Sequence, residues 1–132
     1  MIKKLDHIGV AVKDLATALR FYEETLGLEN VHTEVIEEQG VRVAMLLVGE
    51  SRIELLEPLG PTSPVAKHIE ARGEGVQHIA IEVDDIKAHL EDLAGKGAVL
   101  IDKQPRIGAH GMKIAFLHPK STNGVLLELC QE

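Results

Sequence analysis

The feature of this sequence that most constrains its fold is an internal repeat. Residues 5–15 (LDHIGVAVKDL) and residues 76–86 (VQHIAIEVDDI) align without a gap at an offset of 71, which places His7 on His78. Self-similarity at a fixed offset indicates tandem structural units. Half of a 132-residue chain is too short to bury a core that is stable alone, so we expect two similar modules to share one domain.

A second match lies near the end of each module. The segment VAMLLVGESRIELLEP, residues 43–58, resembles IAFLHPKSTNGVLLELCQ, residues 114–131. Here Glu54 falls on Glu128 at an offset of 74, which a loop three residues longer around PKSTNG explains. The repeat therefore pairs a histidine and a glutamate in each module.

Hydrophobic periodicity predicts the order strand, helix and three further strands in each module. The first strand alternates strictly, with apolar residues on one face and His7 on the other, and the strand around His78 repeats this pattern. Asp14 is expected to cap the first helix, with Leu26 inward and Gly27 ending it. Asp84 or Asp85 is expected to cap the matching helix. The predicted class is α+β.

The segment between the modules predicts a short linker helix. In GPTSPVAKHIEARG, Ser63 is a suitable N-cap and Pro64 suits the first helical position. We therefore expect a single domain over residues 1–132, with modules at about 1–60 and 75–132 and the linker helix at about 61–74.

Four polar residues fall at equivalent strand positions on the face that their apolar neighbours avoid: His7, His78, Glu54 and Glu128. A single such histidine is more often a hydrogen-bonded residue of a sheet. A repeated histidine–glutamate pair favours a shared site instead, because an isolated buried carboxylate is costly without a partner. Two imidazoles with one or two carboxylates suit a divalent metal such as cobalt, manganese, nickel or zinc.

The remaining histidines and the cysteine give weaker signals. His110 in the GAHG loop and His118 before Pro119 each have a loop position from which they could reach a pocket, and this stays open. Cys130 shares a strand face with Glu128, but a small buried apolar residue is the expectation. The chain has no GxGxxG or Walker loop, so nucleotide binding of those kinds is not indicated.

Composition excludes several classes of function. The net charge of -7, without a clustered basic surface, argues against nucleic acid as a partner. The chain has no Trp, one Tyr and two Phe, which disfavours aromatic stacking platforms for flat ligands. No apolar run is long enough to span a membrane. One cysteine and no signal-peptide pattern at the start are typical of a cytoplasmic protein.

Several motifs together resemble the vicinal oxygen chelate superfamily, which includes glyoxalase I, extradiol dioxygenases and antibiotic-resistance binding proteins. These motifs are DHIGVAV, the EL near residue 54, HIAIEV and GVLLEL. Within that superfamily, ELLEPLGPTSPVAKHI and IGAHGMKIAFLHPKSTNGVLLELCQ resemble the methylmalonyl-CoA epimerase family, and the likeness spans nearly the whole chain. The resemblance implies two βαβββ modules that form a cup-shaped eight-stranded mixed sheet with helices on the outside.

The resemblance also implies a ligand set and a reaction. The family's metal positions fall on His7, His78 and Glu128, and a further ligand position, which is Gln in some relatives, falls on Glu54. A position near Val43 carries a carboxylate proposed as a base in at least one relative; the valine here means that this role cannot be carried over.

The implied reaction is epimerisation of methylmalonyl-CoA through removal of the C2 proton and a metal-stabilised enolate. Return of the proton to the other face needs two acid–base groups, and Glu54 and Glu128 are the carboxylates with symmetric positions. The alternatives are a glyoxalase-like lyase or an Fe(II) dioxygenase of the same fold, and then a metal-free small-molecule binding protein.

The expected partners are a CoA thioester substrate and a second copy of the chain in a homodimer, with no nucleic acid and no membrane. Basic residues that could contact the CoA phosphates are Arg42, Arg52, Lys67, Arg106, Lys113 and Lys120.

Overall fold

The computed structural model describes residues 1–132 and contains eight strands, three α-helices, one π-helical turn and three 3-10 turns. The strands are β1 (Ile2–Ala11), β2 (Asn30–Ile36), β3 (Val41–Val48), β4 (Ser51–Pro58), β5 (Gly75–Val83), β6 (Arg106–Ile107), β7 (Lys113–Leu117) and β8 (Leu127–Gln131). The α-helices are α1 (Leu15–Leu19), α2 (Pro64–Arg72) and α3 (Ile86–Gly95). The π-helical turn is η1 (Arg20–Thr25), and the 3-10 turns are η2 (Glu37–Gln39), η3 (Ala109–Gly111) and η4 (Pro119–Ser121).

The strands are hydrogen-bonded in the order β2-β3-β4-β1-β5-β8-β7-β6. The pairs β1–β4 and β5–β8 are parallel, whereas β2–β3, β3–β4, β6–β7 and β7–β8 are antiparallel. Each half of the chain has the order βαβββ. The predicted α+β class and the predicted eight-stranded mixed sheet are therefore confirmed.

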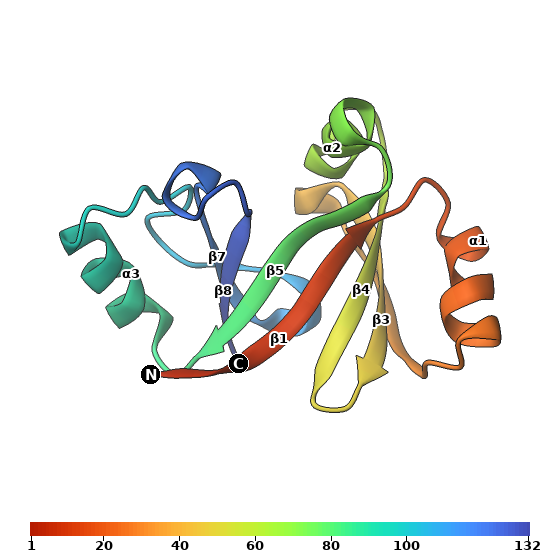
Figure 1. Cartoon of the computed structure of the whole chain (residues 1–132), viewed down its shortest axis with the longest axis horizontal. Helices are drawn as coiled ribbons and strands as arrows, with labels where there is room; N and C mark the ends of the chain where they lie inside the picture. The colour runs from red at the N-terminus through yellow and green to blue at the C-terminus, as the bar shows by residue number, and fades with distance from the viewer. The chain divides into compact units, whose positions relative to one another are not determined.

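The chain divides into two compact units. The N-terminal unit is His7–Gln77, and the C-terminal unit is Met1–Asp6 together with His78–Glu132. Strand β1 is thus divided between them at His7. Figure 1 shows α1 beside the strands of the N-terminal unit and α3 beside those of the C-terminal unit. None of the helices is both long and apolar enough to cross a bilayer.

The core of the N-terminal unit lies between α1 and one face of its strands. Residues from α1 and from β1, β3 and β4 pack into one buried cluster that includes Leu15, Leu46 and Leu55. Alternation along the strands sends every second residue of β4 to this cluster and the residues between them, including Glu54, to the opposite face. The helix-bearing face is thus mainly apolar, and Glu54 lies on the face opposite to it.

The C-terminal unit repeats this arrangement around α3. Ile86 and Leu90 of α3 pack with Ala115, Leu117 and Leu129 from β7 and β8. The opposite face of the same strands has a smaller apolar cluster of Ala80, Met112, Ile114 and Cys130, with Phe116 packed against it.

Side-chain caps begin the helices as the sequence predicts. The Asp14 carboxylate accepts a hydrogen bond from the Thr17 amide at 3.2 Å, and Asp85, not Asp84, caps α3 through the Ala88 amide at 3.2 Å. Ser63 Oγ accepts from the Val65 amide at 3.1 Å, with Pro64 following it. The predicted linker helix is therefore confirmed as α2.

The expectation that one regular helix runs from Asp14 to Gly27 is wrong. Helix α1 ends at Leu19 and continues as the π-helical turn η1. Its amide bonds reach one residue further back than in an α-helix, as in the 2.7 Å bond from the Leu26 amide to the Phe21 carbonyl. This extra residue per turn rotates Leu26 away from the core, so that it is 54% exposed instead of inward.

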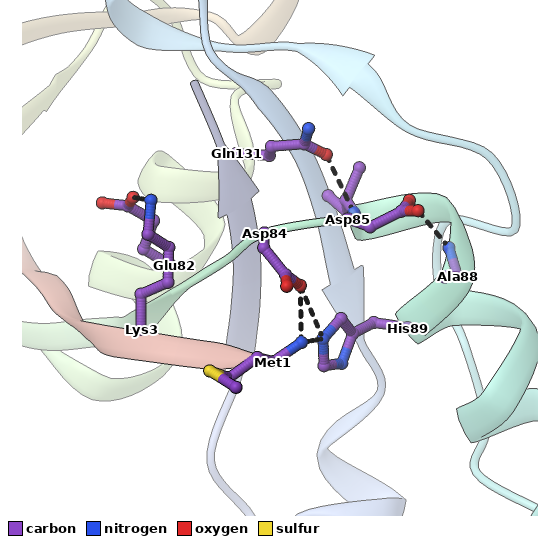
Figure 2. Close-up of polar contacts among 9 residues, drawn as sticks. Met1, Lys3, Glu82, Asp84, Asp85, Ala88, His89 and Gln131 are labelled. Carbon is purple, nitrogen blue, oxygen red and sulfur yellow. Dashed lines mark hydrogen bonds and ion pairs between the residues drawn. The ribbon is translucent and has the colours of Figure 1, made fainter.

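Asp84, the other candidate cap, has a different role in the C-terminal unit. Its carboxylate lies 2.5 Å from the N-terminal nitrogen of Met1, which is also 2.9 Å from His89 Nε2 (Figure 2). The hydrogen bond and charge of this amine lower the pKa of the Asp84 carboxyl. Lys3 reaches Glu82 at 3.3 Å along the same strands (Figure 2). These contacts fasten the start of β1 to the C-terminal unit.

Candidate active site

In the N-terminal unit, the predicted histidine and glutamate lie side by side. Strands β1 and β4 run parallel, and their register pairs His7 with Arg52 and Gly9 with Glu54. His7 Nδ1 lies 3.2 Å from Glu54 Oε2. Both residues are buried, with 5% and 4% of their surface exposed. The parallel pairing of β1 with β4 thus brings together two groups that lie far apart in the sequence.

The C-terminal unit holds the equivalent pair. Strands β5 and β8 run parallel, and their register pairs Ala80 with Glu128. His78 Nε2 lies 3.4 Å from Glu128 Oε1, and both residues are buried. In both units the glutamate faces the residue two positions after the histidine. The pairing that the sequence predicts within each module is therefore present in the structure.

The donor sets fit a divalent metal of the kind that this fold family implies. Donor atoms bound at 2.0–2.2 Å to one such ion lie roughly 3.0 to 3.5 Å from each other. The separations of 3.2 Å and 3.4 Å between imidazole nitrogen and carboxylate oxygen match that spacing. Each unit therefore holds one nitrogen and one oxygen donor at the spacing of two neighbouring ligands of a metal ion.

Sequence analysis did not single out Asp6, the residue before His7 in β1. Asp6 has only 2% of its surface exposed. The sequence could have indicated it, because the two modules differ at this position: the residue before His78 is Gln77. A buried carboxylate next to a candidate ligand adds negative charge near the histidine, which favours a cation there.

Two neighbours of Glu54 are also placed by the strand register. Arg52 Nε lies 3.4 Å from Glu54 Oε2, and the Arg52 side chain remains 20% exposed. Val43 pairs with Leu56 across β3 and β4, which places it on the same face as Glu54, and it is buried. The position near which a relative carries a carboxylate is therefore apolar in this chain.

In the C-terminal unit, Phe116 is the neighbour of the histidine–glutamate pair. It pairs with Glu128 across β7 and β8, and its ring meets the His78 ring edge-on at a centroid distance of 5.6 Å. The guanidinium of Arg106 lies 5.5 Å from the centroid of the same ring. An edge-on aromatic contact restricts the rotation of the imidazole and so helps to fix its donor nitrogen.

The other candidate groups have structural contacts of their own. His118 Nδ1 accepts a hydrogen bond from the Lys120 amide at 2.9 Å, which caps η4. Cys130 is fully buried, and its thiol points to the Ile81 carbonyl at 3.6 Å. These contacts agree with a structural role for Cys130. His110 has a φ of 58° in the GAHG loop, a left-handed conformation that is uncommon for a residue with a side chain.

The sequence pattern of the Glyoxalase/Bleomycin resistance protein/Dioxygenase superfamily matches residues 6–116. The chain belongs to this superfamily. It is 44% identical to the ethylmalonyl-CoA/methylmalonyl-CoA epimerase of Cereibacter sphaeroides, over 99% of each chain. It is 41% identical to the human mitochondrial methylmalonyl-CoA epimerase, over 97% of this chain and 73% of that one.

Among solved structures, a methylmalonyl-CoA epimerase in complex with methylmalonyl-CoA and NH4+ matches with a TM-score of 0.96 and 44% identity. This match covers 100% of the present chain and 96% of the other. The predicted superfamily and the predicted likeness to methylmalonyl-CoA epimerases are confirmed.

Proposed function

We propose that this chain is an enzyme that interconverts the two C2 epimers of methylmalonyl-CoA by removing and returning the C2 proton. The observation that carries the proposal is the pair of buried histidine–glutamate contacts at equivalent positions of the two units. Relatives that are 41% and 44% identical over nearly the whole chain bear the epimerase name. Their names favour an epimerase over the lyase and dioxygenase alternatives.

We further propose that His7, His78 and Glu128 bind one divalent metal ion, with Glu54 as a fourth ligand. All four side chains are buried, and they are of the types that bind such ions. Two imidazoles and two carboxylates suit cobalt, manganese, nickel or zinc. When bound, the ion supplies a Lewis acid that stabilises negative charge on the thioester oxygen.

The acid–base work is assigned to the two glutamates. The C2 proton lies next to a thioester carbonyl and is weakly acidic, so its removal needs a positioned base. One carboxylate takes the proton from one face of C2, and the other returns a proton to the opposite face. The roles exchange for the other epimer. Glu54 and Glu128 fit this scheme because they occupy equivalent positions in the two units.

The direct test is exchange of the C2 proton of methylmalonyl-CoA with D2O, followed by NMR. We expect the wild-type protein to incorporate deuterium and to interconvert the epimers. A chelator should stop both, and one equivalent of a divalent metal should restore both. Exchange at full rate after the metal has been removed, as checked by elemental analysis, would contradict the metal assignment. No exchange by the metal-loaded protein would contradict the proposed reaction.

Three expectations about the whole protein are also proposals. We propose that residues 1–132 form a single domain of two modules, that the protein is a homodimer and that it acts in the cytoplasm. Limited proteolysis tests the first, since a single domain should resist cleavage between its modules. Sedimentation equilibrium tests the second by measuring the mass in solution. Fractionation of the source cells tests the third.

A further inference from the structure

Phe116 is an aromatic residue that lies against one of the proposed metal ligands. It pairs with Glu128 across β7 and β8, so the two side chains project from the same face of the C-terminal unit. Its ring meets the His78 imidazole edge-on, with centroids 5.6 Å apart and an interplanar angle of 86°. At the equivalent position of the N-terminal unit, Met45 pairs with Glu54 in the same way. The two units thus place side chains of different types beside their glutamates.

The two imidazoles present different ring nitrogens to these glutamates. His7 places Nδ1 3.2 Å from Glu54, whereas His78 places Nε2 3.4 Å from Glu128. An imidazole can turn about the bond that joins it to the side chain, and a half-turn exchanges each nitrogen with a carbon atom. A metal ligand has to present one particular nitrogen, so a contact that restricts this rotation helps to form the site. The ring of Phe116 makes such a contact with His78.

Phe116 is itself held in place by Asp102. The Asp102 carboxylate accepts a hydrogen bond through Oδ2 from the Phe116 amide at 2.8 Å. The Asp102 amide donates to the Phe116 carbonyl at 3.2 Å, and the Ile101 amide donates to the same carbonyl at 2.9 Å. The backbone of Phe116 therefore cannot shift along β7 without breaking these bonds.

Arg106 holds the ring of the same residue. It pairs with Ile114 across β6 and β7, two positions before Phe116, so it projects from the face that carries the ring. Its guanidinium carbon lies 5.5 Å from the ring centroid, and its Nε lies 3.2 Å from Asp102 Oδ1. A cation placed over an aromatic ring is attracted by the negative charge of the ring face. One carboxylate thus holds the backbone of Phe116 through one oxygen and Arg106 through the other.

We propose that Arg106 and Asp102 act through Phe116 to fix the His78 imidazole with Nε2 toward Glu128. Both are positioning residues, which act on the ligand and not on the substrate. This inference rests on the proposed function, in which His78 binds a divalent cation, and adds to it the groups that orient this ligand. A ligand that is already fixed loses less conformational freedom when the cation binds, so the cation binds more tightly. Arg106 thereby has a role other than contact with the CoA phosphates.

The first experiment observes the imidazoles of the metal-free protein by long-range 1H–15N NMR, at a pH where they are neutral. Phe116→Met copies the residue at the equivalent position of the N-terminal unit and removes the ring. We expect one sharp set of His78 signals in the wild type, and broadened or averaged signals in Phe116→Met and in Arg106→Met. The His7 signals should not change. Arg106→Lys keeps a cation over the ring and should restore most of the wild-type pattern.

The second experiment measures the dissociation constant of Zn2+ for the same variants, by competition with a chelating dye. Phe116→Met should bind Zn2+ about 2- to 12-fold more weakly, the range that one edge-on aromatic pair supplies. Arg106→Met should bind it about 2- to 5-fold more weakly, as for loss of one cation over a ring. Arg42→Met is the matched control, because it removes an arginine whose ion pair with Glu57, at 2.9 Å, lies in the N-terminal unit. It should change neither the Zn2+ constant nor the His78 signals.

Three results would overturn the inference. Unchanged His78 signals in Phe116→Met would mean that the ring does not fix the imidazole. Equal broadening of His7 and His78 would mean that the substitution loosens the fold in general. Weaker binding of free CoA by Arg106→Met, with unchanged His78 signals, would place Arg106 on the CoA phosphates. Failure of the proposed function is distinguishable, because it appears in the wild type as absence of Zn2+ binding or of C2 exchange, whereas the NMR comparison needs neither metal nor substrate.

Discussion

The two units contain the same histidine–glutamate pair in different surroundings. In the N-terminal unit, the guanidinium of Arg52 lies 3.4 Å from the carboxylate of Glu54. In the C-terminal unit, Phe116 lies edge-on to His78, and the guanidinium of Arg106 lies 5.5 Å from the centroid of the Phe116 ring. The pair is the same in both units, whereas an arginine contacts its glutamate in the first and an aromatic ring contacts its histidine in the second. The two glutamates are thus equivalent in position and differ in the neighbours described around them.

The strands that hold the pair are alike in the two units, whereas the strands at the outer edges of the sheet differ in length. The parallel strands β1–β4 and β5–β8 hold the two histidine–glutamate pairs. In both, the glutamate is paired with the residue two positions after the histidine. At the outer edges, β2 has seven residues whereas β6 has two. A strand that carries no site residue can shorten without moving the pair. The comparison indicates that parallel pairing within each unit is what positions the site.

The largest expected effects come from the histidines. If both units contribute to one metal site, His7→Ala and His78→Ala should each abolish stoichiometric metal binding and C2 exchange, because each removes a nitrogen ligand. Elemental analysis of the purified variants and the D2O assay measure the two losses. Full metal content in either variant would break the equivalence of the units and remove that histidine from the ligand set.

Substitutions of the two glutamates test whether Glu54 and Glu128 act as separate bases. Glu54→Gln keeps the size of the side chain and an oxygen donor, so metal should remain while the base is lost. Epimerisation should then fall by about 10²- to 10⁴-fold, the range that a general base typically supplies. One epimer should still exchange its C2 proton with D2O, because Glu128 continues to serve its face.

Glu128→Gln should be more damaging, since Glu128 also belongs to the proposed ligand set and metal content should fall with activity. Each epimer is assayed separately by NMR, alongside metal analysis. If metal-loaded Glu54→Gln loses exchange equally from both epimers, Glu54 is not one of two separate bases. If it keeps full activity, Glu54 is not a base at all.

The repeat made much of the fold predictable. Aligning His7 with His78 and Glu54 with Glu128 correctly placed the strands that carry the pairs, because a period of two fixes which residues share a face. The N-cap at Ser63 could also be predicted, since the Ser–Pro dipeptide is typical of the start of a helix, here α2.

Features that depend on tertiary contacts could not be predicted from the sequence. The apolar spacing up to Leu26 is compatible with an ordinary helix, and only packing selects the π-helical turn that exposes Leu26. The sequence did not distinguish Arg52 from the other basic residues. Its contact with Glu54 depends on side-chain conformation as well as on strand position. Burial of Asp6 likewise follows from its neighbours in space rather than from its own pattern.

Core truncations test whether the units are equally well packed. Leu55 and Leu129 each follow the glutamate of their unit and are buried in the helix-side clusters. Leu55→Ala and Leu129→Ala should each lower the free energy of unfolding by about 2–5 kcal/mol, since a cavity remains in each cluster. Urea denaturation measures both. A much smaller loss for one of them would show that its cluster relaxes around the cavity.

Helix caps should give smaller effects. Asp85 accepts the Ala88 amide at the start of α3, and Asp85→Ala should lower the free energy of unfolding by about 0.5–2 kcal/mol. The urea midpoint of this variant, compared with that of Asp85→Asn, measures the loss. An asparagine keeps an acceptor at the cap, so Asp85→Asn should lie close to wild type. Equal losses in the two variants would mean that the carboxylate charge matters more than the hydrogen bond.

The smallest expected effect is the dependence of stability on pH that Asp14 contributes through the cap of α1. The hydroxyl and then the amide of Thr17 donate hydrogen bonds to its carboxylate, and these lower the pKa of Asp14 in the folded state. A lowered pKa means that the charged group stabilises the fold above the pKa of the unfolded chain, about 4 for Asp, and that this stabilisation is lost as the pH falls through the folded-state value. Asp14→Asn keeps an acceptor and removes the titration. The wild type should therefore be slightly more stable than Asp14→Asn near pH 7, and the difference should disappear at an acidic pH below the folded-state pKa of Asp14. Solvent keeps the difference small, because the carboxylate is exposed. Urea midpoints of both proteins at the two pH values measure it, and a difference that persists unchanged in acid would mean that the charge of Asp14 does not contribute to the cap.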